Sequence, residues 1–509
     1  MEPSSAPELE RLANSVIQPG FVGTTAPDWV RRKIADGGLR SVVLFGRNIV
    51  DLEQVAALTA ELRAENPDLI IGIDEEAGDV TRLEAGTGAS RPGNLALGAV
   101  DDLGLTESVA RDIGRDLHAA GVSVNFAPSA DVNSNPLNPV IGVRSFGERT
   151  DVVARNTAAW VRGLQQAGVA ACAKHFPGHG DTVVDSHHGL PLVTASAEEI
   201  AATALPPFRA AMEAGVRAIM TGHVLVPAYD PELPATLSRR VLVDLLRTEL
   251  GFTGLLVTDG IEMRAVTDVH GIDGATVKAI TAGVDAVCVG GESASRETAE
   301  LLAGALVRAV RDGELPYARL AEAAANVAAF ASWSAALARS ATPAALADAP
   351  RIGLTAARRA VRVARGEALP LTGAPHVVEF SPAMNLAVDG QTPWGVAGPL
   401  AELRPGTTSV RLTQADVDGS GDAVRTLGLA PAAGRPLVVV VRDAARHRWM
   451  SDAVAAVLGA RPDATVVEMG FPGGEPLGAV HLITHGATRV SGIAAAEVLL
   501  GAAAVTAVG

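Results

Sequence analysis

The sequence predicts an α/β fold: a (β/α)8 TIM barrel followed by a smaller C-terminal α/β sandwich domain. Three observations predict it. Residues 15–291 contain eight short apolar runs separated by stretches of helical period. The runs are nearly continuous in apolar residues, as is typical of parallel strands covered on both faces. Polar and charged residues follow the carboxyl end of nearly every run, whereas the opposite loops, such as AGVS and AGVA, are small and neutral.

The barrel elements can be assigned in order along the chain. The predicted strands are residues 15–21, 41–46, 69–74, 123–132, 171–177, 217–223, 254–260 and 285–291. Amphipathic stretches between them include 52–65, 105–121, 151–168 and a helix around 202–215. Residues 293–338 are Ala-rich with helical period and should complete the outer ring. Each strand–helix–strand crossover is expected to be right-handed. Eight such units in succession can close into a barrel.

A second α/β pattern follows the barrel. We expect a barrel domain at 1–340, a linker at 341–352 and the sandwich domain at 353–509. The strands predicted in the second domain are 376–381, 408–412, 436–443, 465–470 and 479–486. The charged stretch that begins at Arg442 and Asp443 is expected to be the solvated start of a helix, without a functional role.

Composition excludes several classes of protein. The 509 residues carry 42 Lys plus Arg and 57 Asp plus Glu, a net charge of −15, which disfavours nucleic acid or an anionic membrane as a partner. No apolar stretch approaches the ~18 residues of a membrane span. The acidic first residues lack the apolar core of a signal peptide, so a cytoplasmic location is expected unless a leader has been removed. Cys172 and Cys288 lie in apolar runs and should be core residues.

The densest run of reactive side chains is 174–188, which holds four of the chain's 11 histidines. The chain has only three lysines against 39 arginines, so Lys174 indicates a position that needs a compact ammonium. Three interpretations compete. One is a solvated loop, and another is a metal site, although Pro177 and the glycines make a shaped loop without a known ligand spacing. In the third, Lys174 and His175 hold sugar hydroxyls while Asp185 orients His187 for proton transfer.

The run KHFPGHGDTVVDSHHGLP at 174–191 resembles the signature of family 3 glycoside hydrolases, in the NagZ-like β-N-acetylglucosaminidase branch. Three other stretches agree with the family in order and spacing: IGIDEEAGDVTRL (71–83), NPVIGVRSFG (138–147) and LLVTDGIEM (255–263). The resemblance covers about residues 10–340. The C-terminal region resembles the α/β sandwich of two-domain members, without an equally sharp motif.

The resemblance implies a role for each matching residue. Asp259 takes the place of the nucleophile, and His187 that of the general acid/base with Asp185 as its partner. The residues at the family's sugar-contact positions are Asp74, Arg82, Arg144, Lys174 and His175. The sequence departs from the family's usual residues at Ala77, Asp79, Val183 and Gly260. These departures affect the expected substrate preference more than the expected activity.

The expected enzyme is a retaining exo-β-N-acetylglucosaminidase (β-N-acetylhexosaminidase) that works by double displacement without a metal or organic cofactor. Aromatic residues are only 3% of the chain, which favours a short pocket for a terminal N-acetylglucosamine on a small glycoconjugate such as a muropeptide fragment. Two alternatives stay open. A histidine in place of a carboxylic acid lets an anion approach, so phosphate could replace water and make the enzyme a phosphorylase. The chain could also be a catalytically silent sugar-binding or regulatory protein.

Overall fold

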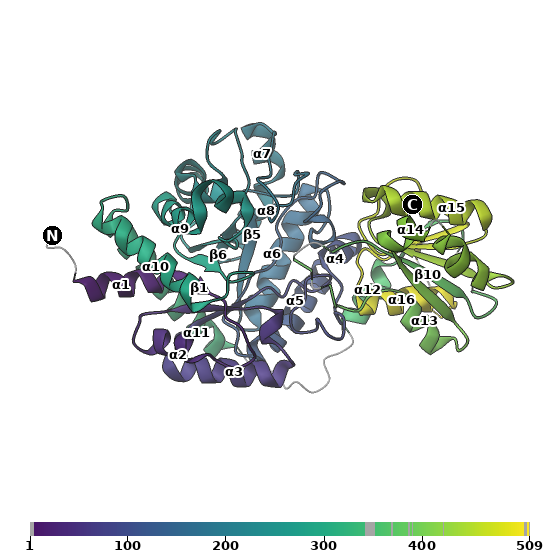
Figure 1. Ribbon diagram of the computed structural model, residues 1–509, viewed down its shortest axis with the longest axis horizontal. Helices are drawn as coiled ribbons and strands as arrows, with labels where there is room; N and C mark the ends of the chain where they lie inside the picture. The colour runs from purple at the N-terminus through teal and green to yellow at the C-terminus, as the bar shows by residue number, and fades with distance from the viewer. Residues whose placement is uncertain are drawn as a thin grey trace. The chain divides into compact units, whose positions relative to one another are not determined.

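The computed structural model describes residues 5–341, 352–367, 370–384, 387–388, 390–420, 422–502 and 506–507 (Figure 1). The chain divides into two compact units. The first consists of Met1–Glu76, Thr106–Ile141 and Glu148–Ala349, and the second of Ala77–Leu105, Gly142–Gly147 and Pro350–Gly509. Most of the predicted linker, residues 342–351, lies outside the described residues.

The first unit is a barrel of eight parallel strands. They are β1 (Ile17–Pro19), β2 (Ser41–Leu44), β3 (Ile70–Ile73), β4 (Val124–Asn125), β5 (Ala170–Phe176), β6 (Ala218–Thr221), β7 (Leu255–Thr258) and β8 (Val287–Val289). Strands β2 to β7 pair in chain order, and β1 pairs with β8. A parallel bridge between Val257 and Ala286 joins β7 to the start of β8, and the Ser41 hydroxyl donates to the Ile17 carbonyl at 3.4 Å. Each strand overlaps a predicted run, so the fold class is confirmed.

Helices surround these strands (Figure 1). They are α1 (Ala6–Ser15), α2 (Asp28–Ala35), α3 (Leu52–Glu65), α5 (Leu103–Ala119), α6 (Thr150–Gln166), α7 (Ala197–Thr203), α8 (Pro206–Glu213), η4 (Arg240–Glu249), α9 (Arg264–Ala282), α10 (Arg296–Arg311) and α11 (Tyr317–Ser340). Local sequence sets their starts: Asp51 accepts a hydrogen bond from the Gln54 amide at 2.8 Å and caps α3. Cys172 and Cys288 are buried free thiols in the core between strands and α11, as predicted.

The second unit contains a seven-stranded sheet in the order β11-β10-β12-β13-β14-β9-β15. Its strands are β9 (Arg362–Arg365), β10 (His376–Ser381), β11 (Thr408–Thr413), β12 (Leu437–Val441), β13 (Thr465–Glu468), β14 (Val480–Ile483) and β15 (Thr506–Ala507). Strands β10 to β14 are parallel, and β9 is antiparallel to β14. All five predicted strands are present. Strand β9 escaped prediction because its residues, RVAR, are partly exposed and form no apolar run.

Apolar side chains of alternating strand residues form one core on each face of this sheet. Val438 and Val440 pack with α12 (Ile352–Ala360), α13 (Ala397–Leu403) and α16 (Arg489–Leu499). Val439 and Val441 pack with α15 (Arg448–Ala460) on the other face. A largely parallel sheet covered on both faces is the predicted sandwich. The second unit also contains α4 (Asn94–Val100), which contacts α12.

Candidate active site

Lys174, near the end of β5, forms a buried charge cluster with two carboxylates that follow β3. Its Nζ lies 2.7 Å from Asp74 Oδ1 and 2.6 Å from Glu76 Oε1. Lys174 and Glu76 are each 2% exposed. Breaking such a buried pair leaves an uncompensated charge, so the three side chains hold one another in place. A compact ammonium fits between two carboxylates here, in agreement with the preference for lysine at this position.

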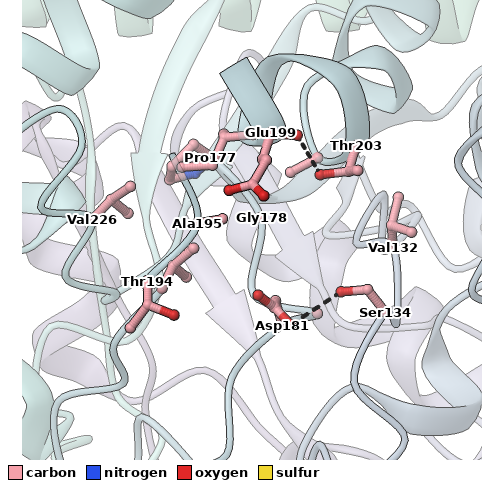
Figure 2. A pocket seen from close by; sticks show the side chains of 14 residues that line it. Val132, Ser134, Pro177, Gly178, Asp181, Thr194, Ala195, Glu199, Thr203 and Val226 are labelled. Carbon is pink, nitrogen blue, oxygen red and sulfur yellow. Dashed lines mark hydrogen bonds between the residues drawn. The ribbon is translucent and has the colours of Figure 1, made fainter. Parts of the chain in front are cut away.

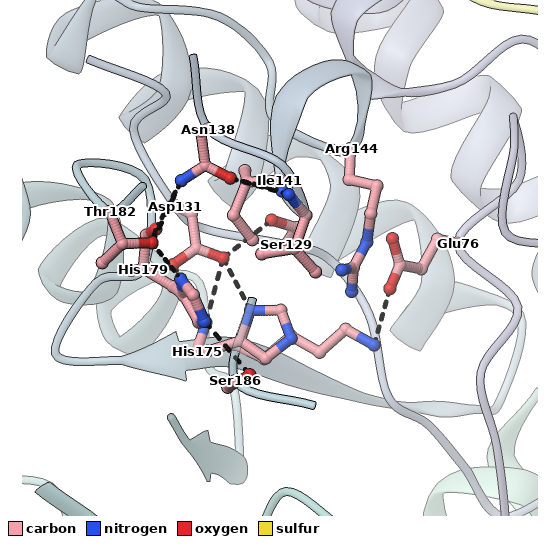
Figure 3. Close-up of polar contacts among 12 residues, drawn as sticks. Glu76, Ser129, Asp131, Asn138, Ile141, Arg144, His175, His179, Thr182 and Ser186 are labelled. Atoms are coloured by element: carbon pink, nitrogen blue, oxygen red, sulfur yellow. Dashed lines mark hydrogen bonds and ion pairs between the residues drawn. The ribbon is translucent and has the colours of Figure 1, made fainter. Parts of the chain in front are cut away.

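His175 is the next residue, and it is joined to Asp131, which follows β4 (Figure 3). His175 Nδ1 lies 2.7 Å from Asp131 Oδ2, and the Ser129 hydroxyl and the His179 amide also donate to this carboxylate, at 3.0 and 2.7 Å. Burial by itself would raise the pKa of Asp131, but the interactions with His175 and His179 outweigh it and lower that pKa overall. An ionised Asp131 accepts the Nδ1 proton of His175 and so sets the orientation of its ring.

His179 connects the start and the end of the loop after β5. Its Nδ1 lies 2.8 Å from Thr182 Oγ1, and its Nε2 lies 3.2 Å from Ser186 Oγ. Asn138 donates to the His179 carbonyl at 2.8 Å and accepts from the Ile141 amide at 2.8 Å (Figure 3). Burial lowers the pKa of His179 to about 4, so the ring is neutral at pH 7. These bonds give His179 a role in shaping the loop.

The same loop holds the predicted Asp185–His187 pair together. Asp185 Oδ1 lies 2.7 Å from His187 Nδ1 and accepts the His187 backbone N–H at 3.0 Å. Burial would raise the pKa of Asp185, but these two bonds lower it overall. The His187 side chain is 24% exposed, whereas Asp185 is buried. The carboxylate therefore fixes a tautomer with the proton on Nδ1, which makes Nε2 the nitrogen that exchanges protons with a ligand.

Asp259 follows β7 directly, and its Oδ1 accepts the Gly260 amide at 2.8 Å. Its Oδ2 has no hydrogen-bond partner in the described part of the chain. Burial would raise the pKa of Asp259, but interactions with the rings of His175, His223 and His187 and the bond from Gly260 hold it below its ordinary value. Asp259 is therefore ionised near neutral pH.

The loop after β5 that carries His179 and His187, called the histidine loop below, also reaches the element that follows Asp259. The Ser186 carbonyl accepts from the Ala265 amide in the first turn of α9, at 3.3 Å. Together with the influence of His187 on the pKa of Asp259, this bond places the loop and the carboxylate at the same end of the barrel. The structure thus brings together six of the eight predicted site residues: Asp74, Lys174, His175, Asp185, His187 and Asp259.

The other two, Arg82 and Arg144, belong to the second unit. Arg82 Nη1 donates to the Ala387 carbonyl at 3.0 Å, and the Arg144 carbonyl accepts from Asn94 Nδ2 at 2.7 Å. Their contact with a sugar bound at the barrel stays a prediction. The expectation that Arg442 is solvated is wrong: it is buried and forms an ion pair with Asp79, because the sandwich core continues past the end of β12.

Sequence reasoning assigned no role to several residues that shape this site. His223 lies 3.0 Å from the Gly260 carbonyl through Nε2 and 2.8 Å from Thr236 Oγ1 through Nδ1. Glu262 Oε1 accepts the amides of Gly290 and Gly291 after β8. Glu76, Asp131 and His179 complete the group. Their place in the sequence could have identified these residues, because most of them follow the carboxyl end of a strand.

A cavity of about 400 Å³ lies beside the histidine loop (Figure 2). Pro177, Gly178 and Asp181 line it on the loop side, and the carboxylate of Glu199 at the start of α7 points into the same space. Its lining does not include Lys174, His187 or Asp259, so it is separate from the catalytic candidates. Among the described residues, no group of three or more His, Cys, Asp or Glu side chains has a geometry suited to a metal ion.

Comparison with known proteins decides the family. The family description "Glycosyl hydrolase family 3 N terminal domain" matches residues 13–330. The chain belongs to glycosyl hydrolase family 3. Within the described residues of this glycoside hydrolase, no helix combines the length and apolar composition needed to cross a membrane.

Individual relatives agree with this assignment. The chain is 39% identical over 284 residues to Beta-hexosaminidase A of Pseudoalteromonas piscicida, covering 52% of this chain but only 47% of that protein. It is 38% identical over 276 residues to a Beta-hexosaminidase of Stenotrophomonas maltophilia (strain K279a), covering 53% of this chain and 82% of the relative. A family 3 beta-N-acetylglucosaminidase from Paenibacillus sp. str. FPU-7 superimposes with a TM-score of 0.86 and 34% identity, over 98% of this chain and 97% of that one. The predicted family is confirmed.

Proposed function

We propose that this family 3 glycoside hydrolase is a retaining exo-β-N-acetylglucosaminidase acting on small glycoconjugates. The observation that carries the proposal is the pairing of an ionised Asp259 with the Asp185–His187 dyad at one end of the barrel. Retaining hydrolysis needs a carboxylate nucleophile and a nearby proton donor. The names of the relatives, which are beta-hexosaminidases and a beta-N-acetylglucosaminidase, support the choice of sugar.

In the first step, Asp259 Oδ2 attacks the anomeric carbon of the terminal sugar. Oδ1 is already held by the Gly260 amide, so Oδ2 is the oxygen available to form the bond. As the glycosidic bond breaks, the proton on His187 Nε2 moves to the leaving oxygen. The Asp185 carboxylate stabilises the imidazolium that must be present before this transfer.

In the second step, water hydrolyses the glycosyl ester. His187, now neutral, accepts a proton from water through Nε2 while the hydroxide oxygen bonds to the anomeric carbon and releases Asp259. The configuration at that carbon is inverted twice and therefore retained. A neutral imidazole is a competent base for this step because its ordinary pKa lies near neutrality.

The charge cluster around Lys174 suits a neutral sugar. Asp74 and Glu76 more than balance the ammonium, so no isolated cation is available to select an anionic ring. Ion-paired side chains still offer N–H donors and carboxylate acceptors to hydroxyl groups. We assign His175, oriented by Asp131, to the same sugar-holding set.

The nucleophile is tested with Asp259→Ala and 4-nitrophenyl N-acetyl-β-glucosaminide. We expect kcat to fall by roughly 10³-fold or more, since the covalent route is lost. Added azide should restore turnover and give the α-glycosyl azide, because a small anion then takes the place of the carboxylate. The matched control is Asp268→Ala, which removes an exposed carboxylate from α9 and should retain full activity. Retention of activity in Asp259→Ala would contradict the proposal.

Product analysis separates hydrolysis from phosphorolysis. The proposal predicts free N-acetylglucosamine with or without phosphate. A phosphate-dependent sugar 1-phosphate would instead make the chain a phosphorylase that uses the same two residues. Tight sugar binding without nitrophenol release from the wild-type protein would favour the silent binding protein.

A further inference from the structure

The second unit has a ligand-sized cavity at a characteristic place in its sheet. From β10 the chain runs to β11 on one side, and it then crosses to β12 on the other side of β10. Ligands of open α/β sheets bind at the carboxyl ends of the strands where the connections diverge in this way. A cavity of about 530 Å³ lies there, lined by Ser381 at the end of β10 and Arg442 directly after β12.

Arg442 brings unsatisfied hydrogen-bond donors to this cavity. It is 5% exposed, and its Nη2 pairs with Asp79, whose other oxygen accepts the Ala487 amide at 3.1 Å. The N–H groups on Nε and Nη1 have no hydrogen-bond partner within the described residues. These nitrogens are not fully enclosed, so a ligand with oxygen acceptors in the cavity can complete the hydrogen bonding of this guanidinium.

The second arginine of the cavity, Arg411, is held more tightly. Its Nε and Nη2 donate to Glu379 Oε2 at 3.1 and 2.6 Å, and its guanidinium lies 4.6 Å from the centre of the Trp394 ring. The Arg442 guanidinium lies 5.5 Å from the same ring. Each arginine therefore has its own carboxylate, and the four charged groups sum to zero.

Hydroxyl groups and apolar atoms complete the lining. Thr392 Oγ1 is buried without a hydrogen-bond partner in the described chain, and the Ser381 hydroxyl lies in the same cavity. Met384 and the Trp394 indole supply apolar surface. The cavity thus combines N–H donors, hydroxyls and an aromatic side chain without net charge.

We propose that this cavity binds a neutral saccharide of one or two rings. Sugar hydroxyls can accept from the two guanidinium groups and exchange hydrogen bonds with the threonine and serine hydroxyls. The C–H face of a pyranose can pack on indole surface. The volume lies within the range of small-molecule sites. A balanced set of charges gives an anion no net attraction, and unpaired N–H donors disfavour an apolar ligand. The proposal is independent of the activity proposed for the barrel.

The test uses the full-length Asp259→Asn protein, which should not turn over sugar, titrated with N-acetylglucosamine and N,N′-diacetylchitobiose. We expect tryptophan fluorescence to change on saturation, and this change to disappear in a Trp394→Phe variant. Thr392→Val should weaken this binding about 3- to 10-fold, the effect of one hydrogen bond. It should not lower the melting temperature, because the threonine hydroxyl has no partner to lose.

A steric variant gives an independent readout. A Cβ on Gly390 meets no atom within 4 Å, so Gly390→Phe can be accommodated locally and should occlude the cavity it lines. Gly398→Phe is the matched control, since Gly398 is equally open but is an exposed residue of α13 outside the cavity. We expect loss of the fluorescence change in the first variant and its retention in the second. A chitobiose-induced fluorescence change that is identical in the parent, Gly390→Phe and Thr392→Val proteins would overturn the proposal, as would a Trp394 response to inorganic phosphate but to neither sugar.

Discussion

Replacing Lys174 by methionine should destabilise the first unit in a pH-dependent way. The substitution keeps a long, unbranched side chain but removes the ammonium that lies 2.6 Å from Glu76 and 2.7 Å from Asp74. Glu76 is 2% exposed and becomes an unpaired buried carboxylate, for which the usual cost is about 3–5 kcal/mol. The Asp74 side chain is 20% exposed and adds less, because water screens its charge.

The expected change is large enough to measure by thermal unfolding. Roughly 300 residues unfold with an entropy of about 0.6 kcal/mol per kelvin, so a loss of about 4 kcal/mol lowers the melting temperature by about 6 °C. The deficit should be larger at pH 7.5 than at pH 5. A buried, unpaired carboxylate retains a proton more strongly in the folded chain than in the unfolded chain, so the stability of the variant is lost as pH rises.

Two further proteins decide whether the reasoning is correct. Lys174→Met combined with Glu76→Gln should recover most of the lost stability, because the unpaired charge is gone. Arg296→Met removes one partner of an exposed ion pair with Glu300 and should leave the melting temperature unchanged. Equal melting temperatures for wild type and Lys174→Met at pH 7.5, or no recovery in the double variant, would refute the argument from buried charge.

Three other changes test the histidine loop. Asp185→Asn should lower kcat/KM by about 10²–10⁴-fold and move the alkaline limb of its pH profile to lower pH, because the imidazolium loses its carboxylate. His179→Gln should flatten the fall in unfolding free energy between pH 6.5 and pH 4: burial lowers the pKa of His179 to about 4, so the unfolded chain is protonated first as pH falls. Gly180→Ala should destabilise the loop in urea titrations, since its Cβ would lie 1.8 Å from the Val132 carbonyl oxygen, whereas Gly189→Ala, with its nearest atom at 3.6 Å, should be tolerated.

The barrel could be predicted because burial leaves a strong trace in the sequence. A strand covered on both faces needs apolar residues at every position, and β7, with Leu255 to Thr258 all buried, appears as such a run. A partly exposed strand has no such requirement. In β9, which lies between β14 and the short β15, Arg362 and Arg365 flank two small apolar residues, so the stretch resembles a loop.

The site residues could be collected from strand ends, but their pairing could not be predicted. Lys174 and Asp74 are 100 positions apart, and His175 and Asp131 are 44 apart, so no local spacing connects them. The Asp185–His187 pair was predictable because two residues of one loop can bond locally. Arg442 escaped for the opposite reason: a charged residue after a strand is usually solvated, and only its partner Asp79, 363 positions away, explains its burial.

The division of charge in the barrel explains how Asp259 can be ionised and still reactive. The interactions that most lower its pKa come from the rings of His175, His223 and His187. Lys174, the strongest local cation, is neutralised by Asp74 and Glu76. An oxygen bonded directly to an ammonium would have to give up that bond before attacking carbon, whereas Asp259 Oδ2 has no such bond to lose within the described residues. The loss of Lys174 should therefore weaken stability and sugar binding while leaving the attacking oxygen of Asp259 without a broken bond.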